Sequence, residues 1–322
     1  MASTPNGLYI GEGGASGDNA GKLFRWNDVD TLVEVAPQYE TERGIYALVL
    51  FNEKIYGGTR DDGELLEWNG ANAWVQVAQQ LNAQEVIMCL RVFNGKVYGG
   101  TFDSVDGGRL FEWNGADAWV EKAFSLDNED YILDLVELGG KLYGSTSSLG
   151  GRLYEWNGTN AWVQVAPLLD GQVTARTLAV LNGKIYCGTQ QGGRLFEWNG
   201  TNAWVQVAPQ LNSQTHIWGL VNFNGELYAG TQPGGRLFKW NGTNAWVQMA
   251  GQSGTNTAVL GLTEHDGKLY GGQYDLLEWN GVDAWVVKAT MPDIGTIRCL
   301  VSVEGLEEGG SGSGILFFGH NF

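Results

Sequence analysis

Few side chains in this chain have the type and spacing needed for metal or nucleophilic chemistry. Its three histidines are His216, His265 and His320, and no two of them have the spacing of a metal-ligand pair. Its three cysteines also lack metal-type spacing, and we expect them to be small buried residues of a reduced protein. They are Cys89, Cys187 and Cys299. The sequence therefore predicts no metal, no cofactor and no enzymatic activity.

Carboxylates are more numerous, and some of them fall in segments that we predict to be the inner strands of a ring. Asp134 and Glu137 lie in one such segment and Glu264 in another, where they could act as acids or bases. We expect them instead to face a wet central channel. The glutamate before a recurring WN pair is expected to be a solvated strand residue rather than a catalytic acid. It is found at Glu67, Glu112, Glu155, Glu197 and Glu278.

Ligand binding is indicated by residues that vary between the copies of a repeated sequence. Near the start of the first strand, just before a small residue, the copies carry Tyr46, Met88, Leu133, Arg176, Trp218, Leu260 or Arg298. The loop between the second and third strands carries Arg60, Phe102, Ser147, Gln190, Gln232 or Tyr274. Aromatic rings stack on the apolar face of a sugar, whereas amides and guanidinium groups bind hydroxyls or carboxylates. The candidate ligand-binding residues are Trp218, Tyr46, Arg176, Arg298, Arg60, Phe102, Gln190, Gln232, Tyr274 and His216.

The elements that must position these residues follow from the repeat itself. The pair WN occurs seven times, at Trp26, Trp68, Trp113, Trp156, Trp198, Trp240 and Trp279, with successive spacings of 42, 45, 43, 42, 42 and 39 residues. A repeat of about forty residues built from four short apolar runs is typical of a propeller blade. Thirteen of the 14 tryptophans occupy two repeated positions, where we expect them to pack as wedges between blades, and only Trp218 lies outside them.

One unit is predicted to contain four strands, beginning at residues 44, 54, 64 and 73 in the first complete copy. Asn-Gly pairs such as Asn94-Gly95 and Asn182-Gly183 join the first strand to the second, and they favour the positive φ angles of tight hairpins. The first strand is apolar on both faces, as stacking between neighbouring blades requires. The loops from the fourth strand to the first, and from the second to the third, are the variable ones, and both lie on the same face of the ring.

Counting these units predicts the architecture of the whole chain. Six complete units run from residue 44 to about residue 290, preceded by the second, third and fourth strands alone and followed by a lone first strand at 296–303. We therefore predict an all-β fold, a seven-bladed β-propeller of four-stranded antiparallel blades. A composite blade closes it, with its first strand from the C-terminus and the other three from the N-terminus, and closure removes an exposed sheet edge.

The end of the chain does not fit this ring. We divide the sequence into a propeller at 1–305, a Gly/Ser-rich linker at 306–314 and a strand-like tail at 315–322. Ile315–Gly319 resembles a second strand and competes with Leu8–Gly11 for one place in the closing blade. The tail could pack outside the ring, pair with another molecule or be the remnant of a longer array, and the linker could be engineered. These alternatives stay open.

The repeat resembles that of the kelch propellers. The stretch VLNGKIYCGT, followed by a polar loop, an acidic third strand and AWVQVAP, has the kelch order of a first strand, a tyrosine with a Gly pair, and a tryptophan in the fourth strand. The units are shorter than the ~50 residues usual for kelch, and the WNG sequence is not a general kelch feature. The resemblance covers nearly the whole chain and implies a propeller that binds proteins or carbohydrates or, less often, acts as an enzyme.

The charge of the chain narrows its partners. The net charge is −17, from 36 acidic and 19 basic residues, and a surface of this sign repels nucleic acid and anionic membranes. No apolar run approaches the ~18 residues of a membrane-spanning helix, and residues 1–14 lack the basic start and apolar core of a signal peptide. We expect a monomer that does not insert into membranes, located in the cytoplasm or in a phage-like particle.

These observations lead to one functional hypothesis and two rivals. The hypothesis is a non-enzymatic, lectin-like binding module whose variable face holds a glycan or an extended peptide. The main rival is a structural or scaffold repeat protein without a small ligand, such as a phage-tail or adhesin component or an engineered propeller. The similarity between copies favours this rival, because duplication makes such arrays without selecting seven sites. A hydrolase or oxidase at the mouth of the channel is the third alternative, and it would require turnover.

Overall fold

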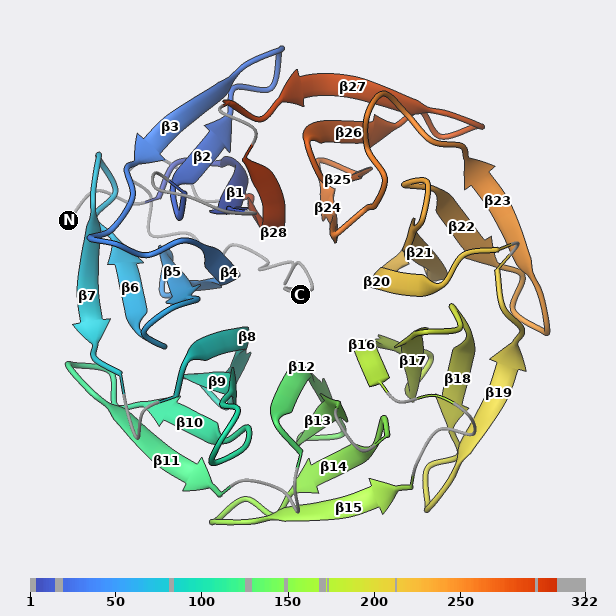
Figure 1. Ribbon diagram of the computed structural model, residues 1–322, viewed down its shortest axis with the longest axis horizontal. Coiled ribbons are helices and arrows are strands. Elements are labelled where there is room, and N and C mark those ends of the chain that lie inside the picture. Colours follow the sequence, from blue (N-terminus) through green and yellow to red (C-terminus); the bar gives the residue numbers. More distant parts are fainter. Residues whose placement is uncertain are drawn as a thin grey trace.

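The computed structural model describes residues 4–14, 20–80, 84–124, 129–147, 150–167, 172, 174–211, 213–292 and 295–305. Within these ranges the chain forms 28 β-strands, arranged around a central axis (Figure 1). In the same ranges no helix has the length and apolar character needed to cross a membrane. The linker at 306–314 and the tail at 315–322, including the competing strand at Ile315–Gly319, lie outside the described residues.

The strands form antiparallel sets of four, each of which we call a unit. The first four units are β4 (Ile45–Phe51), β5 (Lys54–Thr59), β6 (Leu65–Trp68) and β7 (Trp74–Ala78); β8 (Val86–Phe93), β9 (Lys96–Phe102), β10 (Leu110–Trp113) and β11 (Trp119–Ala123); β12 (Tyr131–Leu138), β13 (Lys141–Ser147), β14 (Leu153–Trp156) and β15 (Trp162–Ala166); and β16 (Thr174–Leu181), β17 (Lys184–Gln190), β18 (Leu195–Trp198) and β19 (Trp204–Ala208). The next two are β20 (His216–Phe223), β21 (Glu226–Gln232), β22 (Leu237–Trp240) and β23 (Trp246–Ala250); and β24 (Gly261–His265), β25 (Lys268–Gly272), β26 (Asp275–Trp279) and β27 (Trp285–Thr290).

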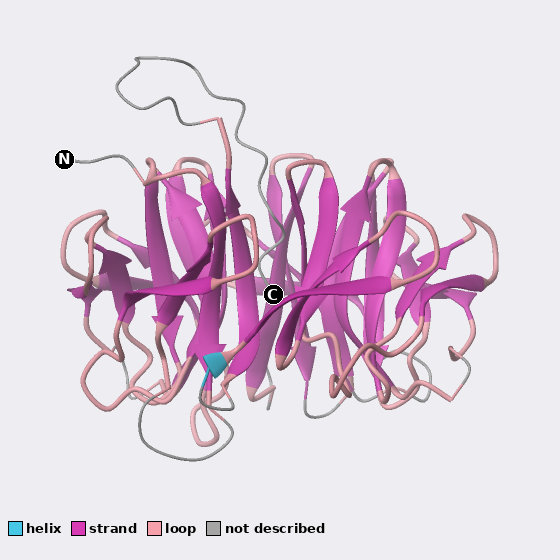
Figure 2. Ribbon diagram, turned by 90° about the horizontal axis from the view of Figure 1, so that it is seen from above, coloured by secondary structure: helices cyan, strands magenta, loops and turns pink. Residues whose placement is uncertain are grey.

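The remaining sheet combines both ends of the described chain. It has the order β28-β1-β2-β3, formed by β28 (Thr296–Val303), β1 (Gly7–Gly13), β2 (Leu23–Trp26) and β3 (Leu32–Ala36). β28 and β1 are antiparallel and pair from Gly7 with Val303 to Gly13 with Thr296. The predicted all-β fold and its four-stranded antiparallel sheets are therefore confirmed. In Figure 1 the first strand of each unit lies nearest the axis and the fourth lies at the rim, and Figure 2 shows loops on the two opposite faces of the ring.

Neighbouring units are joined by a repeated contact between a tryptophan and a tyrosine. Trp68 of β6 lies 5.3 Å from Tyr9 of β1, measured between ring centroids, and the same contact recurs with centroid distances from 5.0 to 5.4 Å. The other pairs are Tyr56–Trp113, Tyr98–Trp156, Tyr143–Trp198, Tyr186–Trp240, Tyr228–Trp279 and Trp26–Tyr270. Trp68 also donates its Nε1–H to the Val35 carbonyl of the preceding unit. These tryptophans therefore pack between units, as the repeat predicts.

The glutamate before WN is not a solvated residue, so that prediction was wrong. In the unit β8–β11, the side chain of Glu112 is only 7 % exposed, and it accepts hydrogen bonds from Lys96 Nζ at 2.6 Å and Tyr98 OH at 2.5 Å. Glu67, Glu155, Glu197 and Glu278 make the matching ion pair with the first lysine of the second strand. One unit exchanges the charges, with Lys239 paired to Glu226. The glutamate is therefore part of the framework, fixed by a tyrosine and a lysine.

The expectation that Asp134 faces a wet channel was also wrong. Asp134 is 4 % exposed, and its carboxylate accepts hydrogen bonds from the backbone N–H of Leu178 at 2.7 Å and of Leu135 at 2.8 Å. Because Leu178 belongs to the next inner strand, the aspartate joins two units. Glu137 is exposed and Glu264 is half-buried. The three cysteines are buried and make no disulfide, as expected for small packed residues.

Candidate functional site

The candidate site is built on a β-bulge that recurs in the inner strands. In the pairing of β4 with β5, Ile45 is opposite Thr59 and Ala47 is opposite Gly58, so Tyr46 has no partner in the ladder. The same shift in register leaves out Met88, Leu133, Arg176, Trp218 and Arg298. A bulge residue is freed from pairing, and its side chain is aimed away from the regular pleat. The variable position of the sequence is thus the bulge position of the fold.

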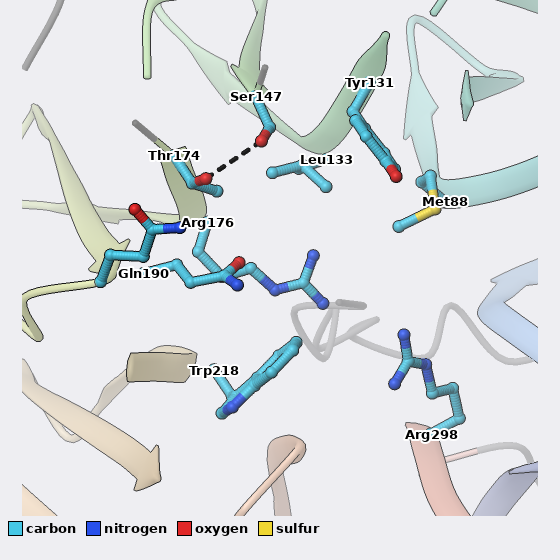
Figure 3. Close-up of a pocket in the computed structure, with 10 residues that line it drawn as sticks. Met88, Tyr131, Leu133, Ser147, Thr174, Arg176, Gln190, Trp218 and Arg298 are labelled. Carbon is cyan, nitrogen blue, oxygen red and sulfur yellow. Dashed lines mark hydrogen bonds between the residues drawn. The ribbon is translucent and has the colours of Figure 1, made fainter. Parts of the chain in front are cut away.

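Five of these bulge residues line one cavity of about 390 Å³ (Figure 3). The cavity is lined by Met88, Tyr131, Leu133, Ser147, Thr174, Arg176, Gln190, Gln191, Trp218 and Arg298. They come from the inner strands and from the ends of the neighbouring second strands. Single residue pairs, such as Ser147 with Thr174, link the end of one second strand to the start of the next inner strand at this level. The bulges and these links place side chains from five units around one opening.

A second cavity of about 500 Å³ adjoins the first and shares Met88, Tyr131 and Arg298 with it. Its lining residues are Arg43, Tyr46, Arg60, Asp61, Glu85, Val86, Met88, Phe102, Tyr131 and Arg298. Unlike the first cavity, it contains carboxylates. One of them, Asp61, forms an ion pair with Arg43, with 2.5 Å between Oδ1 and Nη2. The two cavities therefore differ in charge.

The structure brings together nine of the ten predicted site residues. Trp218, Arg176, Arg298 and Gln190 line the first cavity; Tyr46, Arg60 and Phe102 line the second; and His216 and Gln232 contact Trp218. Tyr274 is the exception, because it lines neither cavity. Its backbone N–H donates to Asn256 Oδ1 at 2.9 Å and its carbonyl accepts from the Met291 N–H at 2.8 Å. The structure therefore does not place Tyr274 with the other nine residues.

Trp218 is held on several sides by other residues. Its ring stacks on His216, with centroids 5.6 Å apart and planes 4° apart, and its Nε1–H donates to Gln232 Oε1 at 2.7 Å. The guanidinium carbon of Arg176 lies 4.4 Å from the centre of its ring. Burial, and after it the charge of Arg176, lowers the pKa of His216, which favours a neutral imidazole. The indole is therefore a fixed support for Arg176.

Arg298 has a similar aromatic support. Its guanidinium carbon lies 4.1 Å from the centre of the Tyr46 ring, and that of Arg60 lies 5.6 Å from the same ring. Arg60 also donates to the Gly14 carbonyl at 3.2 Å. Contacts between guanidinium groups and aromatic faces strengthen when water is excluded. The aromatic residues of the site thus orient its cations.

Sequence reasoning missed several lining residues. Tyr131 and Thr174 begin their inner strands two residues before the bulge, at the position that His216 occupies in its own unit. Aligning His216 with the other copies would have identified both. Met88 and Leu133 were recognised as variable but not assigned to the site, because an apolar residue in a predicted strand is first assigned to the core. Gln191 lies in the loop after β17, and nothing in the sequence except its position beside Gln190 indicates that it lines the cavity.

One group elsewhere in the described residues has the composition of a metal site. The possible ligand atoms of His265, Asp266 and Glu304 lie within 4.8 Å of one another. His265 is 2 % exposed, and its Nδ1 is 2.9 Å from Ser302 Oγ while its Nε2 is 3.4 Å from Asp28 Oδ1. These partners belong to β28 and to the turn after β2. The contacts therefore join the last unit to the sheet that holds both ends of the described chain.

Comparison with known proteins identifies the fold but no family. No protein-family model and no curated protein sequence matches the chain. Similar solved structures include catalytically inactive virginiamycin B lyase from Staphylococcus aureus with quinupristin (TM-score 0.59, 10% identity, 78% of this chain and 85% of that chain) and the WD40 β-propeller domain of Doa1 (0.57, 10%, 84% and 93%). A third is YCF48 bound to D1 peptide (0.55, 14%, 78% and 84%). Because the identities are this low, the comparisons show only that the fold is similar to that of β-propellers.

Proposed function

We propose that the chain is a seven-bladed β-propeller of kelch-like repeats, in which residues 1–305 form a ring closed by a composite blade. The pairing of β28 with β1 supports the closure, because it joins the last strand to three strands from the start of the chain. The contact between Trp26 and Tyr270 supports it as well, since it repeats, between the sheet β28-β1-β2-β3 and the unit β24–β27, the contact found between the other neighbouring units. A closed propeller leaves only short, protected strand edges.

The function that this geometry supports best is ligand binding without turnover. The ligand, a glycan or an extended peptide, lies at the mouth of the central channel, on the face formed by the loops that enter the inner strands and those that leave the second strands. One observation carries the proposal, namely that the bulge residues of five units line a single cavity of about 390 Å³. This volume lies in the range of small-molecule sites.

Known propellers make this use of the fold plausible without identifying the ligand. YCF48 is bound to D1 peptide, and virginiamycin B lyase is seen with quinupristin. The lyase is also a reminder that a propeller can carry catalysis, so function must be argued from the site. In this chain the site offers guanidinium, amide, hydroxyl and apolar groups. These groups suit recognition.

The proposal is tested by binding to a glycan array and a peptide array with four proteins. They are the wild type, Trp218→Ala, Arg298→Gln and the control Lys184→Gln. Lys184 pairs with Leu181 at one end of β16 and β17, whereas Thr174 and Gln190 pair at the other end. The control substitution Lys184→Gln therefore removes a positive charge from the opposite face of the ring. We expect ligands that bind the wild type and the control but not the two mouth variants. Circular dichroism of each protein checks that the variants remain folded.

Two results would contradict the proposal. Binding that survives in both mouth variants would move the site elsewhere on the ring. If the wild type binds nothing on either array, the result would favour the rival function of a scaffold or structural repeat protein, in which the variable face has no small ligand.

A further inference from the structure

Two arginine side chains line the first cavity, and none of the other described residues that line it is acidic. Arg176 comes from β16 and Arg298 from β28, and Figure 3 shows both guanidinium groups directed toward the middle of the cavity. Neither group forms an ion pair with a carboxylate among the residues that the structure describes, and the buried Asp134, which lies outside the cavity lining, is the carboxylate whose charge acts on Arg176. The cavity is therefore positively charged, in a chain whose net charge is −17.

The two positive charges disfavour each other in this cavity. Burial, and after it the charge of Arg298, lowers the pKa of the Arg176 guanidinium to about 10. The Nε of Arg176 is buried, and no hydrogen-bond acceptor for it is found in the described part of the chain. Aromatic rings, rather than carboxylates, hold both side chains, through Trp218 and Tyr46. An anion between the two guanidinium groups would relieve their repulsion and accept the unused hydrogen bonds.

Another wall of the same cavity is apolar. Met88 and Leu133 are 8 % and 5 % exposed, and they form one hydrophobic cluster with Val86, against which Tyr131 packs. The ring of Tyr131 stacks on Phe102, with centroids 4.2 Å apart. Figure 3 shows Met88, Leu133 and Tyr131 together on one side of the cavity. A ligand that fills the cavity therefore meets positive charge on one side and apolar surface on another.

A neutral sugar fits this arrangement less well than an anion does. Stacking on a sugar requires an open aromatic face. The ring of Trp218 already contacts His216 and Arg176, and its Nε1–H is used by Gln232. The ring of Tyr46 lies against Arg298. Two of the aromatic residues that the sequence suggests as sugar platforms, Trp218 and Tyr46, are thus occupied in placing guanidinium groups.

We propose that the cavity binds a carboxylate carried by an apolar group, as found at the C-terminus of a peptide that ends in an apolar residue. This inference rests on the proposed function and names its ligand class. The carboxylate lies between Arg176 and Arg298, and the apolar group lies against Met88, Leu133 and Tyr131. A cavity of about 390 Å³ has room for one large residue with its terminal carboxylate.

The test compares two probes of nearly equal size, one with a carboxylate and the other with a neutral amide in its place. N-acetyl-L-phenylalanine and its uncharged amide are titrated into the full chain by isothermal calorimetry at low and at physiological salt. We expect the acid to bind at least tenfold more tightly than the amide, and its affinity to fall as salt rises. In Arg176→Gln and Arg298→Gln the affinity for the acid should fall at least tenfold, to that of the amide. Lys184→Gln should bind both probes like the wild type.

Several results would overturn this inference. Equal binding of acid and amide would show that charge is not recognised, and full affinity in both arginine variants would place the anion elsewhere. A second acid, D-glucuronate, has the carboxylate without the apolar group; if it binds as tightly as N-acetylphenylalanine, the apolar part of the inference fails. If neither acid binds while array ligands do bind at the mouth, the ligand class is wrong and the proposed function stands. If nothing binds in any assay, both fail.

Discussion

The buried carboxylate of Asp134 makes the stability of the ring depend on pH in a defined direction. Asp134 occupies the position after a bulge, and its oxygens accept hydrogen bonds from the N–H groups of Leu178 and Leu135. Burial raises the pKa of Asp134 to about 6, although these hydrogen bonds and the charges of Arg91 and Arg176 act in the opposite direction. The ordinary value, taken for the unfolded chain, is 3.8.

The sign follows from the two pKa values. Because the folded pKa lies above the unfolded one, the folded state keeps the proton over a range in which the unfolded state has lost it. This contribution to stability is complete below the unfolded pKa and is lost as pH rises through the folded pKa. A difference of about two pKa units corresponds to about 3 kcal/mol in total, of which about 2 kcal/mol is lost between pH ~4 and ~7.

The substitution Asp134→Asn isolates this effect. The amide removes the titration, while its oxygen can still accept from the Leu178 N–H. If the hydrogen bond from the Leu135 N–H is lost, the free energy of unfolding falls by the same amount at every pH. The free energy of unfolding of the variant minus that of the wild type should therefore rise by about 2 kcal/mol from pH ~4 to ~7. Glu64, with a pKa raised by burial to about 7, is present in both proteins and cancels.

The assay is urea unfolding followed by tryptophan fluorescence, for both proteins at several pH values and constant ionic strength. Glu137→Gln provides a matched control, because Glu137 lies on the same strand and is exposed. The pH dependence measured for Asp134→Asn is then compared with that measured for Glu137→Gln. A difference for Asp134→Asn that stays constant, or that falls as pH rises, would mean that the folded state ionises Asp134 without penalty.

Two further predictions concern the contacts between units. Ala175 stands where the other units have isoleucine or valine, and Ser145 stands where the facing second strand otherwise has glycine, so Ala175→Ile should cost roughly 1–3 kcal/mol through overpacking. Adding Ser145→Gly should restore most of the lost stability in thermal unfolding. If the effect of the double substitution equals the sum of the two single effects, the two positions are not coupled and the prediction fails. Trp68→Phe should lower the free energy of unfolding by about 1 kcal/mol more than Trp156→Phe does. The reason is that Trp68 Nε1 donates a hydrogen bond to Val35 O, whereas Trp156 Nε1 has no partner in the described residues. Equal costs in chemical denaturation would contradict this.

The strands could be predicted from the sequence because the repeat averages over copies. The second strand expected from residue 54 is β5 (Lys54–Thr59), and the first strand expected from residue 44 is β4 (Ile45–Phe51). Asn-Gly turns and period-two alternation are local signals, so they need no knowledge of the tertiary structure. What lies against each face of a strand is not local. That is why the paired glutamates were assigned to solvent, although a lysine and a tyrosine of the adjacent strand cover them.

The bulge explains the error at Asp134 and also limits how well a site can be predicted. Alternation places residues i and i+2 on one face, but an extra residue in one strand reverses the assignment of everything that follows it. Leu133 is that extra residue, so Asp134 turns toward the neighbouring unit rather than the channel. No single copy of the repeat reveals the bulge. Only the comparison of copies does, as a variable residue followed by a small or buried one.

The same bulge bears on whether variation at the mouth reflects function or drift. A bulge residue has no partner in the ladder, so replacing it leaves the framework of its unit intact, and drift alone would make this position variable. Drift, however, does not account for the support around Arg176. Trp218 lies beneath its guanidinium group, His216 stacks on Trp218, and Gln232 accepts the indole N–H. Three residues of one unit thus hold the charge of an arginine from the neighbouring unit, in a cavity whose described lining contains no carboxylate. Such support is expected where the charge has a ligand, and it is why the arginine pair, rather than the tryptophan, is the feature to test first.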